Sequence, residues 1–162
     1  MNTRVGIGYD SHRFAAGRPL RIAGLTVPHT HGLVGHSDGD VALHALIDAL
    51  LGAAALGDIG QHFPDDDPQW KGVDSARLLK KVVDTLRQGG YAVGQVDITV
   101  LAERPKIAAL IAQMRAATAK ALGVATEAVS IKAKTNEGMG WLGRGEGVAA
   151  LAVATIVQAA GG

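Results

Sequence analysis

"DVALHALIDALLGAAAL", residues 40–56, is the stretch that decides the fold. It is too long and too rich in Ala and Leu for a strand, so it predicts a helix that ends near Gly57. Ser37 is the expected N-cap, with Asp38 and Asp40 in the first turn. Large apolar side chains fall almost all the way round this helix, which therefore has to be buried. They are Val41, Leu43, Leu46, Ile47, Leu50 and Leu51.

The polar residues of this helix form one stripe. Asp40, His44 and Asp48 are spaced four apart and stack on one side. Buried Asp and His need polar partners or a metal. Two interpretations stay open: the stripe faces a polar or metal site, or His44 is a core histidine bonded to a neighbouring Asp.

"RVGIGYDSHRF", residues 4–14, supplies two candidate metal ligands. Residues 4–9 predict a strand, and Asp10 and His12 follow where that strand is expected to end. Side chains two apart on an extended chain share a face, so these two can converge on one ion; the alternative is a turn Asp and a surface His. With His44 they give three N/O ligands, which leaves the fourth position of a catalytic zinc open to a substrate oxygen.

The rest of the chain mixes strands and helices. Strands are expected at 20–27, 96–101, 129–135 and 148–158, a polar loop at 58–73, and helices at 75–88 and from Pro105 to Gly123. This order predicts one α+β domain over residues 1–162, a two-layer sandwich of one mixed β-sheet packed on helices.

The composition limits the classes of ligand and partner that the protein is expected to bind. Lys and Arg total 16 against 15 Asp and Glu, and a net charge of +1 gives no electrostatic footprint for nucleic acid or a membrane surface. The sequence has no cysteine, which leaves His, Asp and Glu as metal ligands. Because no apolar run reaches membrane-spanning length and the first residues lack a signal-peptide pattern, a cytoplasmic protein is expected.

Other polar residues are placed to meet an anionic ligand. His36 and Ser37 lie at the start of the buried helix, where free N–H groups favour a phosphate. Lys106 in "AERPKIA" could contact a phosphate, and Glu137 in "KAKTNEG" could bind magnesium. The aspartates of the 58–67 loop could bind substrate hydroxyls. For each of these residues an ordinary surface role stays open.

Five stretches together are highly specific. "GIGYDSHRF", "GHSDGDVALHALIDALLGAAALGDIGQHFPD", "KGVDSARLL", "VDITVLAERPKI" and "IKAKTNEGMGWLGRGEGVA" follow one another over nearly the whole chain. In this order they closely resemble the 2-C-methyl-D-erythritol 2,4-cyclodiphosphate synthase family of the non-mevalonate isoprenoid route. The resemblance implies that the 2-phosphate of 4-diphosphocytidyl-2-C-methyl-D-erythritol 2-phosphate attacks the β-phosphorus, which closes a cyclic diphosphate and releases CMP.

The resemblance also implies the metal ligands. Asp10, His12 and His44 would bind Zn²⁺ or another divalent transition metal, with a β-phosphate oxygen in the open position. Glu137 would contact a Mg²⁺ or Mn²⁺ ion between the phosphates.

His36 and Thr135 match positions that stabilise the transition state. The implied substrate-binding positions are Ser37, Asp58, Ile59, Gly60, Phe63, Pro64, Asp65, Asp66, Asp67, Ala102, Pro105, Lys106, Ile107, Ala108, Lys134, Asn136, Trp141 and Arg144. Two of them depart from the family pattern: Lys134 stands where some members carry a small hydroxyl residue, and Trp141 where others carry Phe or Tyr.

The family is a homotrimer with active sites between subunits, the zinc side from one chain and the cytidine side from its neighbour. The resemblance therefore implies a homotrimer that takes a small nucleotide-linked substrate. It leaves open whether an isoprenoid diphosphate binds in the apolar central cavity of the trimer.

Two other functions are compatible with an open metal triad. A metal-dependent phosphohydrolase would use the same open zinc to activate water, but would not need the cytidine segments. A non-catalytic carrier of metal or isoprenoid diphosphate would be favoured by a degenerate triad, whereas the triad here is intact.

Overall fold

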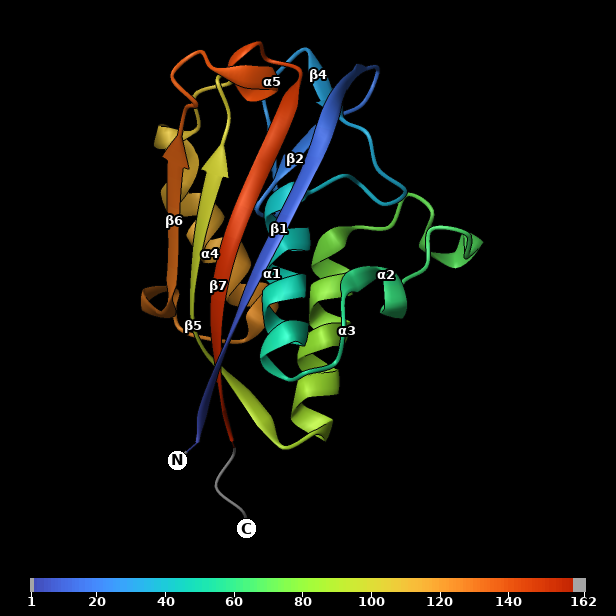
Figure 1. Ribbon diagram of the computed structural model, residues 1–162, viewed down its shortest axis with the longest axis vertical. Coiled ribbons are helices and arrows are strands. Elements are labelled where there is room, and N and C mark those ends of the chain that lie inside the picture. Colours follow the sequence, from blue (N-terminus) through green and yellow to red (C-terminus); the bar gives the residue numbers. More distant parts are fainter. Residues whose placement is uncertain (1, 159–162) are drawn as a thin grey trace.

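The computed structural model describes residues 2–158, and within them one mixed sheet is covered on one side by helices (Figure 1). The strand order is β4-β1-β7-β5-β6, and the β5–β6 pair is parallel while the other pairs are antiparallel. The strands are β1 (Thr3–Ala16), β4 (His31–Leu33), β5 (Tyr91–Leu101), β6 (Val129–Lys134) and β7 (Gly147–Gln158). The predicted α+β class with one mixed sheet packed on helices is confirmed.

Three long helices form the second layer. They are α1 (Val41–Ala53), α3 (Ser75–Gln88) and α4 (Ile111–Leu122), with the short helices α2 (Ile59–His62) and α5 (Gly140–Gly143) and the 3-10 turns η1 (Pro68–Trp70), η2 (Ala108–Leu110) and η3 (Thr126–Ala128) between them. None of these helices is both long and apolar enough to cross a membrane.

Helix α1 is buried against the centre of the sheet, as its sequence predicts. It approaches β1 so closely that a Cβ on Gly8 would lie 1.9 Å from the carbonyl oxygen of Ala45. A Cβ on Gly6 would lie 2.0 Å from that of Ala49. Glycine is therefore needed at both positions for the helix to lie on the strand.

The N-cap of α1 is Asp40, so the expectation of Ser37 was wrong. The carboxylate of Asp40 accepts N–H bonds from Leu43 of its own helix and from Ala23 and Gly24 of a neighbouring turn, at 2.7–3.1 Å. Burial raises the pKa of Asp40, and the three N–H donors oppose that effect. Asp40 is the N-cap because its carboxylate binds backbone N–H groups of a distant segment as well as of the first turn of the helix.

Strand β1 does not end at Tyr9 as expected. It continues to Ala16, because Asp10 to Arg13 pair with the first residues of β7, Asp10 opposite Ala150 and His12 opposite Val148. Polar side chains do not stop a strand when a neighbouring strand continues to satisfy its backbone. Asp10 and His12 therefore sit on a rigid ladder.

Other boundaries also differ from expectation: α1 ends at Ala53 rather than near Gly57, β5 begins at Tyr91 rather than at residue 96, and the expected loop 58–73 contains α2 and η1. Residues 20–27 form a hairpin, β2 (Leu20–Ile22) and β3 (Leu25–Val27), because Ala23 and Gly24 both adopt positive φ. Strand β4 was not expected; its three residues pair with the unexpected extension of β1. Pro105 lies in a loop after a cis peptide bond and α4 starts only at Ile111, because the apolar side chain of Ile107 anchors that loop in the core.

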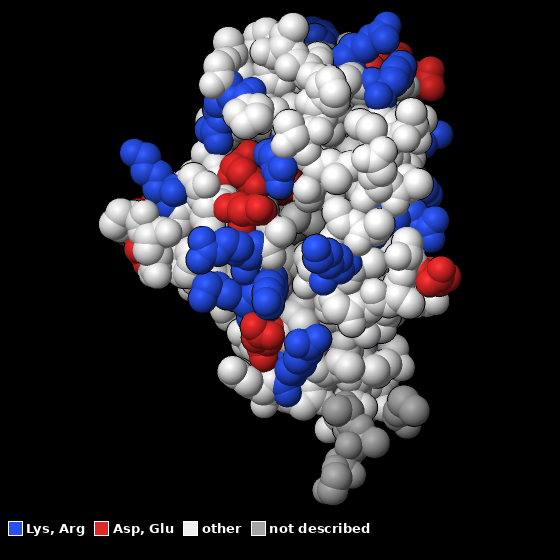
Figure 2. Space-filling view, turned by 180° about the vertical axis from the view of Figure 1, so that it is seen from behind, with Lys and Arg blue, Asp and Glu red and all other residues white. Residues whose placement is uncertain are grey.

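The sheet face opposite the helices is apolar and open. Val5, Ile7 and Tyr9 of β1 are 54–70% exposed, and Leu151 and Val153 of β7 are 40–41% exposed. Large contiguous apolar patches on soluble proteins mark interaction surfaces. The helical side looks different: seen from behind, Lys and Arg are interspersed with Asp and Glu (Figure 2).

Candidate active site

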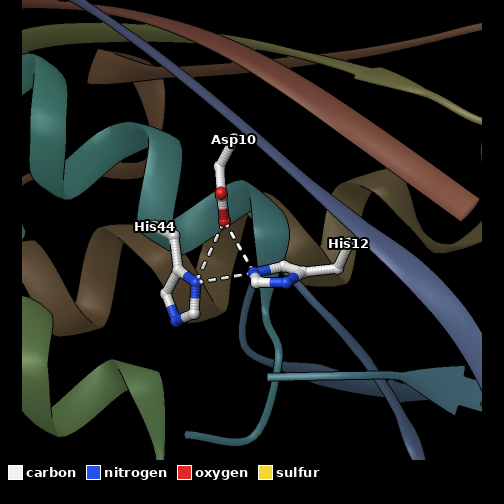
Figure 3. Close-up of side chains that lie close together, drawn as sticks. All are labelled: Asp10, His12 and His44. Atoms are coloured by element: carbon white, nitrogen blue, oxygen red, sulfur yellow. Dashed lines mark hydrogen bonds and ion pairs between the residues drawn. The ribbon is translucent and has the colours of Figure 1, made fainter. Parts of the chain in front are cut away.

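The side chains of Asp10, His12 and His44 meet at one point between β1 and α1 (Figure 3). His12 Nε2 lies 2.8 Å and His44 Nδ1 3.1 Å from the same Asp10 oxygen, Oδ2, and the two nitrogens are 3.1 Å apart. The ladder fixes the first two residues and the buried helix fixes the third. The predicted convergence of the three side chains is confirmed.

The donor set fits a divalent transition metal. Ligands of a tetrahedral zinc, bonded at about 2.0–2.1 Å, stand about 3.3 Å apart, so a slight expansion of this triangle would admit the ion. Two imidazole nitrogens and one carboxylate oxygen are the ligands such a metal takes in the absence of thiolates. The triad leaves the fourth direction open, toward a cavity.

Electrostatics favour the charged forms of Asp10 and His44. Burial raises the pKa of Asp10, but hydrogen bonds and charge from His12 and His44 outweigh it, and the pKa falls from 3.8 to about 2. Burial lowers the pKa of His44, but the hydrogen bond and charge of Asp10 outweigh it and the pKa is raised. A cation is thus strongly favoured beside Asp10.

A cavity of about 350 Å³ lies beside the triad. Of the predicted residues, its lining holds His36, Ser37, Ile59, Gly60, Phe63 and Asp65. The lining also includes Trp70, which the sequence reading missed: its ring stacks edge-on against Phe63, with centroids 5.1 Å apart. An aromatic residue in a Pro- and Gly-rich loop was the available signal.

Some loop residues named from the sequence hold the backbone instead. Asp58 caps α2 by accepting from Gln61 N at 3.0 Å, and Asp67 caps η1 by accepting from Gln69 N at 3.0 Å. His36 Nε2 donates to the carbonyl oxygen of Asp67 at 3.1 Å. Pro64 and Asp66 are exposed and do not line the cavity.

A second cavity, of about 150 Å³, joins two distant segments. Ala102, Pro105, Lys106, Ile107 and Ala108 line it from the loop after β5, with Lys134 and Thr135 at the end of β6. The two segments meet because β5 and β6 are parallel neighbours, Leu101 pairing with Lys134. All seven are among the substrate-binding or transition-state positions that the family resemblance implies.

The loop after β6 is organised by Glu103, which the sequence reading did not single out. Its Oε1 atom accepts from Asn136 N at 2.8 Å and from Gly138 N at 3.3 Å. Glu137, between these two residues, has a φ of 53° and an exposed side chain. The Glu103 contact depends on how the two loops meet and has no local sequence signal.

Trp141 lies elsewhere, in a cavity of about 650 Å³ that also contains His12 and Glu146. Arg144 Nη2 donates to Glu146 Oε2 at 3.0 Å on the same loop. His12 borders both this cavity and the one beside the triad.

The model of the YgbB family matches residues 3–157. This chain belongs to the YgbB family. The family resemblance stated from the sequence is thereby confirmed, and the match spans both the triad and the second cavity.

Two curated relatives with more than half of the aligned residues identical carry the name 2-C-methyl-D-erythritol 2,4-cyclodiphosphate synthase. The protein of that name from Salinibacter ruber is 56% identical over 96% of this chain and 99% of its own length. The one from Pseudomonas aeruginosa is 55% identical over 95% of this chain and 98% of its own length.

Solved structures agree with the YgbB fold. A 2C-methyl-D-erythritol-2,4-cyclodiphosphate synthase described as a CDP-bound form superposes with a TM-score of 0.87 at 36% identity, covering 95% of this chain and all of that one. The bifunctional IspDF of Campylobacter jejuni superposes with a TM-score of 0.92 at 41% identity. That match covers 96% of this chain, which spans only 42% of the bifunctional protein.

Within one YgbB chain the two cavities stand apart. Ser11, Ala149, Leu101 and Lys134 lie in one row across β1, β7, β5 and β6. Three strand spacings of ~4.8 Å separate Ser11 from Lys134, about 14 Å. The triad and the second cavity therefore do not form one pocket in a single chain.

Proposed function

We propose that this YgbB family enzyme converts 4-diphosphocytidyl-2-C-methyl-D-erythritol 2-phosphate to 2-C-methyl-D-erythritol 2,4-cyclodiphosphate and CMP, in the non-mevalonate route to isoprenoids. The observation that carries the proposal is the Asp10–His12–His44 triangle in the lining of a cavity, in a chain that shares over half its residues with named synthases. Residues 1–162 would form the single catalytic domain.

The reaction joins two anionic groups. An oxygen of the 2-phosphate attacks the β-phosphorus, the bond from that phosphorus to the oxygen of the α-phosphate breaks, and CMP leaves with those electrons. Because both reacting groups are in one molecule, holding the flexible chain in a bent conformation supplies much of the rate. Water is not a reactant.

Asp10, His12 and His44 would hold the transition metal, for which Zn²⁺ is the first choice. The ion, when bound, would neutralise charge that develops on a phosphate oxygen. The remaining residues bind and orient: His36 and Ser37 lie beside the triad in the 350 Å³ cavity, where an anion would reach them.

The second cavity would take the cytidine diphosphate end. Lys106 and Lys134 line it with two cations, and Thr135 lies beside them. Thr135 and His36 would stabilise the transition state. Glu137, exposed on the adjoining loop, would bind a Mg²⁺ or Mn²⁺ ion shared with the phosphates.

We also propose a homotrimer whose active sites lie between subunits. Two observations support it: the open apolar face of β1 and β7, and the separation of the two cavities by three strand spacings. Packing those faces together would bury the apolar side chains and bring the second cavity of one subunit toward the triad of another. The cytoplasmic location expected from the sequence stays a prediction.

The test is a product assay. Purified protein with Zn²⁺ and Mg²⁺ should convert the diphosphocytidyl substrate to CMP and cyclic diphosphate in equal amounts. Phosphorus NMR distinguishes the cyclic product from linear phosphates. If linear hydrolysis products form instead, the protein is a phosphohydrolase and the cyclase proposal is wrong.

A further inference from the structure

The far side of the His44 ring carries a hydrogen-bonded chain that no step of the proposed reaction uses. His44 Nδ1 faces Asp10 and His12, while Nε2 points the other way, into the protein. There Nε2 lies 2.8 Å from the hydroxyl of Ser75, the first residue of α3. The Ser75 residue is fully buried. The Ser37 hydroxyl lies 2.9 Å from the same nitrogen.

The Ser75 hydroxyl is in turn bound to Asp38. Its Oγ donates to Asp38 Oδ1 at 2.5 Å, and the Ser75 backbone N–H donates to Oδ2 at 3.1 Å. Arg21 completes the chain, with Nε 3.7 Å from Asp38 Oδ2. The Asp38 carboxylate is thus connected to the proposed metal ligand His44 through two hydrogen bonds that share the Ser75 hydroxyl.

The direction of these bonds follows from the donor inventory. A carboxylate only accepts, so the one hydroxyl hydrogen of Ser75 points at Asp38. The Ser75 oxygen then offers only lone pairs to His44, and Nε2 must carry the ring hydrogen. Neutral His44 therefore keeps the lone pair on Nδ1, the nitrogen that faces the other two ligands.

We propose that Asp38 and Ser75 are positioning residues that hold His44 in its metal-binding tautomer and orientation. Asp38 acts through Ser75, and neither side chain touches the metal or the substrate. This inference rests on the metal role proposed for the triad. Mutation of a residue that hydrogen-bonds a metal-ligating histidine typically lowers metal affinity about 10- to 100-fold.

The variants Ser75→Ala and Asp38→Asn test the chain from both ends. Ser75→Ala removes the acceptor at Nε2 and leaves only Ser37 there. Asp38→Asn can turn an amide N–H toward Ser75, which would reverse the hydroxyl and place a donor against Nε2. Ring nitrogen Nδ1 would then carry the hydrogen, which blocks metal binding.

Asp74→Asn is the matched control. Asp74 also faces Arg21, at 3.7 Å, and caps α3 by accepting from Ala76 N at 2.8 Å, but it makes no contact with His44. It reports the effect of removing a carboxylate charge at the start of α3 alone, because Asn can still cap the helix. Circular dichroism of each metal-free variant shows whether it is folded.

The first measurement is zinc affinity, by competition with a chromophoric chelator. We expect Ser75→Ala and Asp38→Asn each to weaken zinc binding by about 10- to 100-fold and Asp74→Asn to leave it unchanged. In the double variant Ser75→Ala/Asp38→Asn, the loss of binding free energy should fall well short of the sum of the two single losses, because Asp38 acts mainly through Ser75. Single variants that bind zinc like the parent protein, or losses that add, overturn the proposal.

The second measurement is the ¹⁵N NMR spectrum of His44 in metal-free protein, at a pH where the ring is neutral. Nε2 should carry the hydrogen in the parent protein, and Nδ1 should gain it in Asp38→Asn. An unchanged tautomer in Asp38→Asn would contradict the proposed role of the Asp38–Ser75–His44 hydrogen bonds. A parent that binds no zinc would instead refute the metal role of the triad, so the two failures are distinguishable.

Discussion

Asp48 Oδ1 accepts a hydrogen bond from the backbone N–H of Ile59 at 2.7 Å. Asp48 is the last member of the polar stripe of α1, and Ile59 opens α2, which lines the cavity beside the triad. One helix therefore positions both His44, the proposed metal ligand, and the segment 58–60 proposed to bind substrate.

Replacing Asp48 by Ala should weaken substrate binding more than it slows turnover. A hydrogen bond to a charged group contributes about 1.5–3 kcal/mol to stability. Because Asp48 is only half-buried, we expect the lower part of that range. We expect KM to rise by up to about tenfold, with a smaller change in kcat, because the freed segment must be ordered at each binding event. Steady-state kinetics measure both. Asp84→Ala, which removes an exposed carboxylate of α3, is the control and should change neither.

The raised pKa of Asp48 also leads us to expect that the stability of the protein depends on pH. Burial raises its pKa above 3.8, so ionisation of Asp48 costs the folded state free energy at neutral pH. That cost is absent below pH 3.8 and is complete above the raised pKa of the folded state. Asp48→Asn mimics the neutral form, so its stability relative to the parent should increase as the pH rises through this window. Urea denaturation at several pH values tests this; a constant difference would show that the pKa of Asp48 is not raised.

The approach of α1 to β1 predicts opposite effects of two alanine substitutions. Gly8→Ala would place a Cβ 1.9 Å from a helix carbonyl oxygen, and the helix must shift, at a cost of about 1–3 kcal/mol or more. Gly52, in the last turn of α1, has its nearest neighbour 4.0 Å away, so Gly52→Ala should stabilise the protein by about 0.5–1 kcal/mol. Urea denaturation of both variants measures the difference. Equal effects of the two substitutions would contradict the close contact.

The parts predicted from the sequence are those with a local signal. The burial of α1, the stripe with His44, and the shared face of Asp10 and His12 each follow from the period of one helix or one strand. The N-cap Asp40, the extension of β1 and the contact of Glu103 with Asn136 depend on segments far apart in the sequence. The same holds for Ser75 and His44, 31 positions apart, which meet only because α3 packs beside α1.

The proposed active site between subunits can be tested by mixing two inactive variants. His44→Ala disables the triad, and Thr135→Ala disables the second cavity, so each variant alone should be inactive. If each site takes its triad from one subunit and Thr135 from the next, random trimers from an equal mixture should restore about one quarter of parental activity, because a quarter of the interfaces pair two intact halves. Co-refolding followed by an assay of CMP release measures this, with light scattering to confirm three subunits. A site made within one chain predicts no recovery in trimers that have demonstrably mixed, and that outcome would refute the shared site.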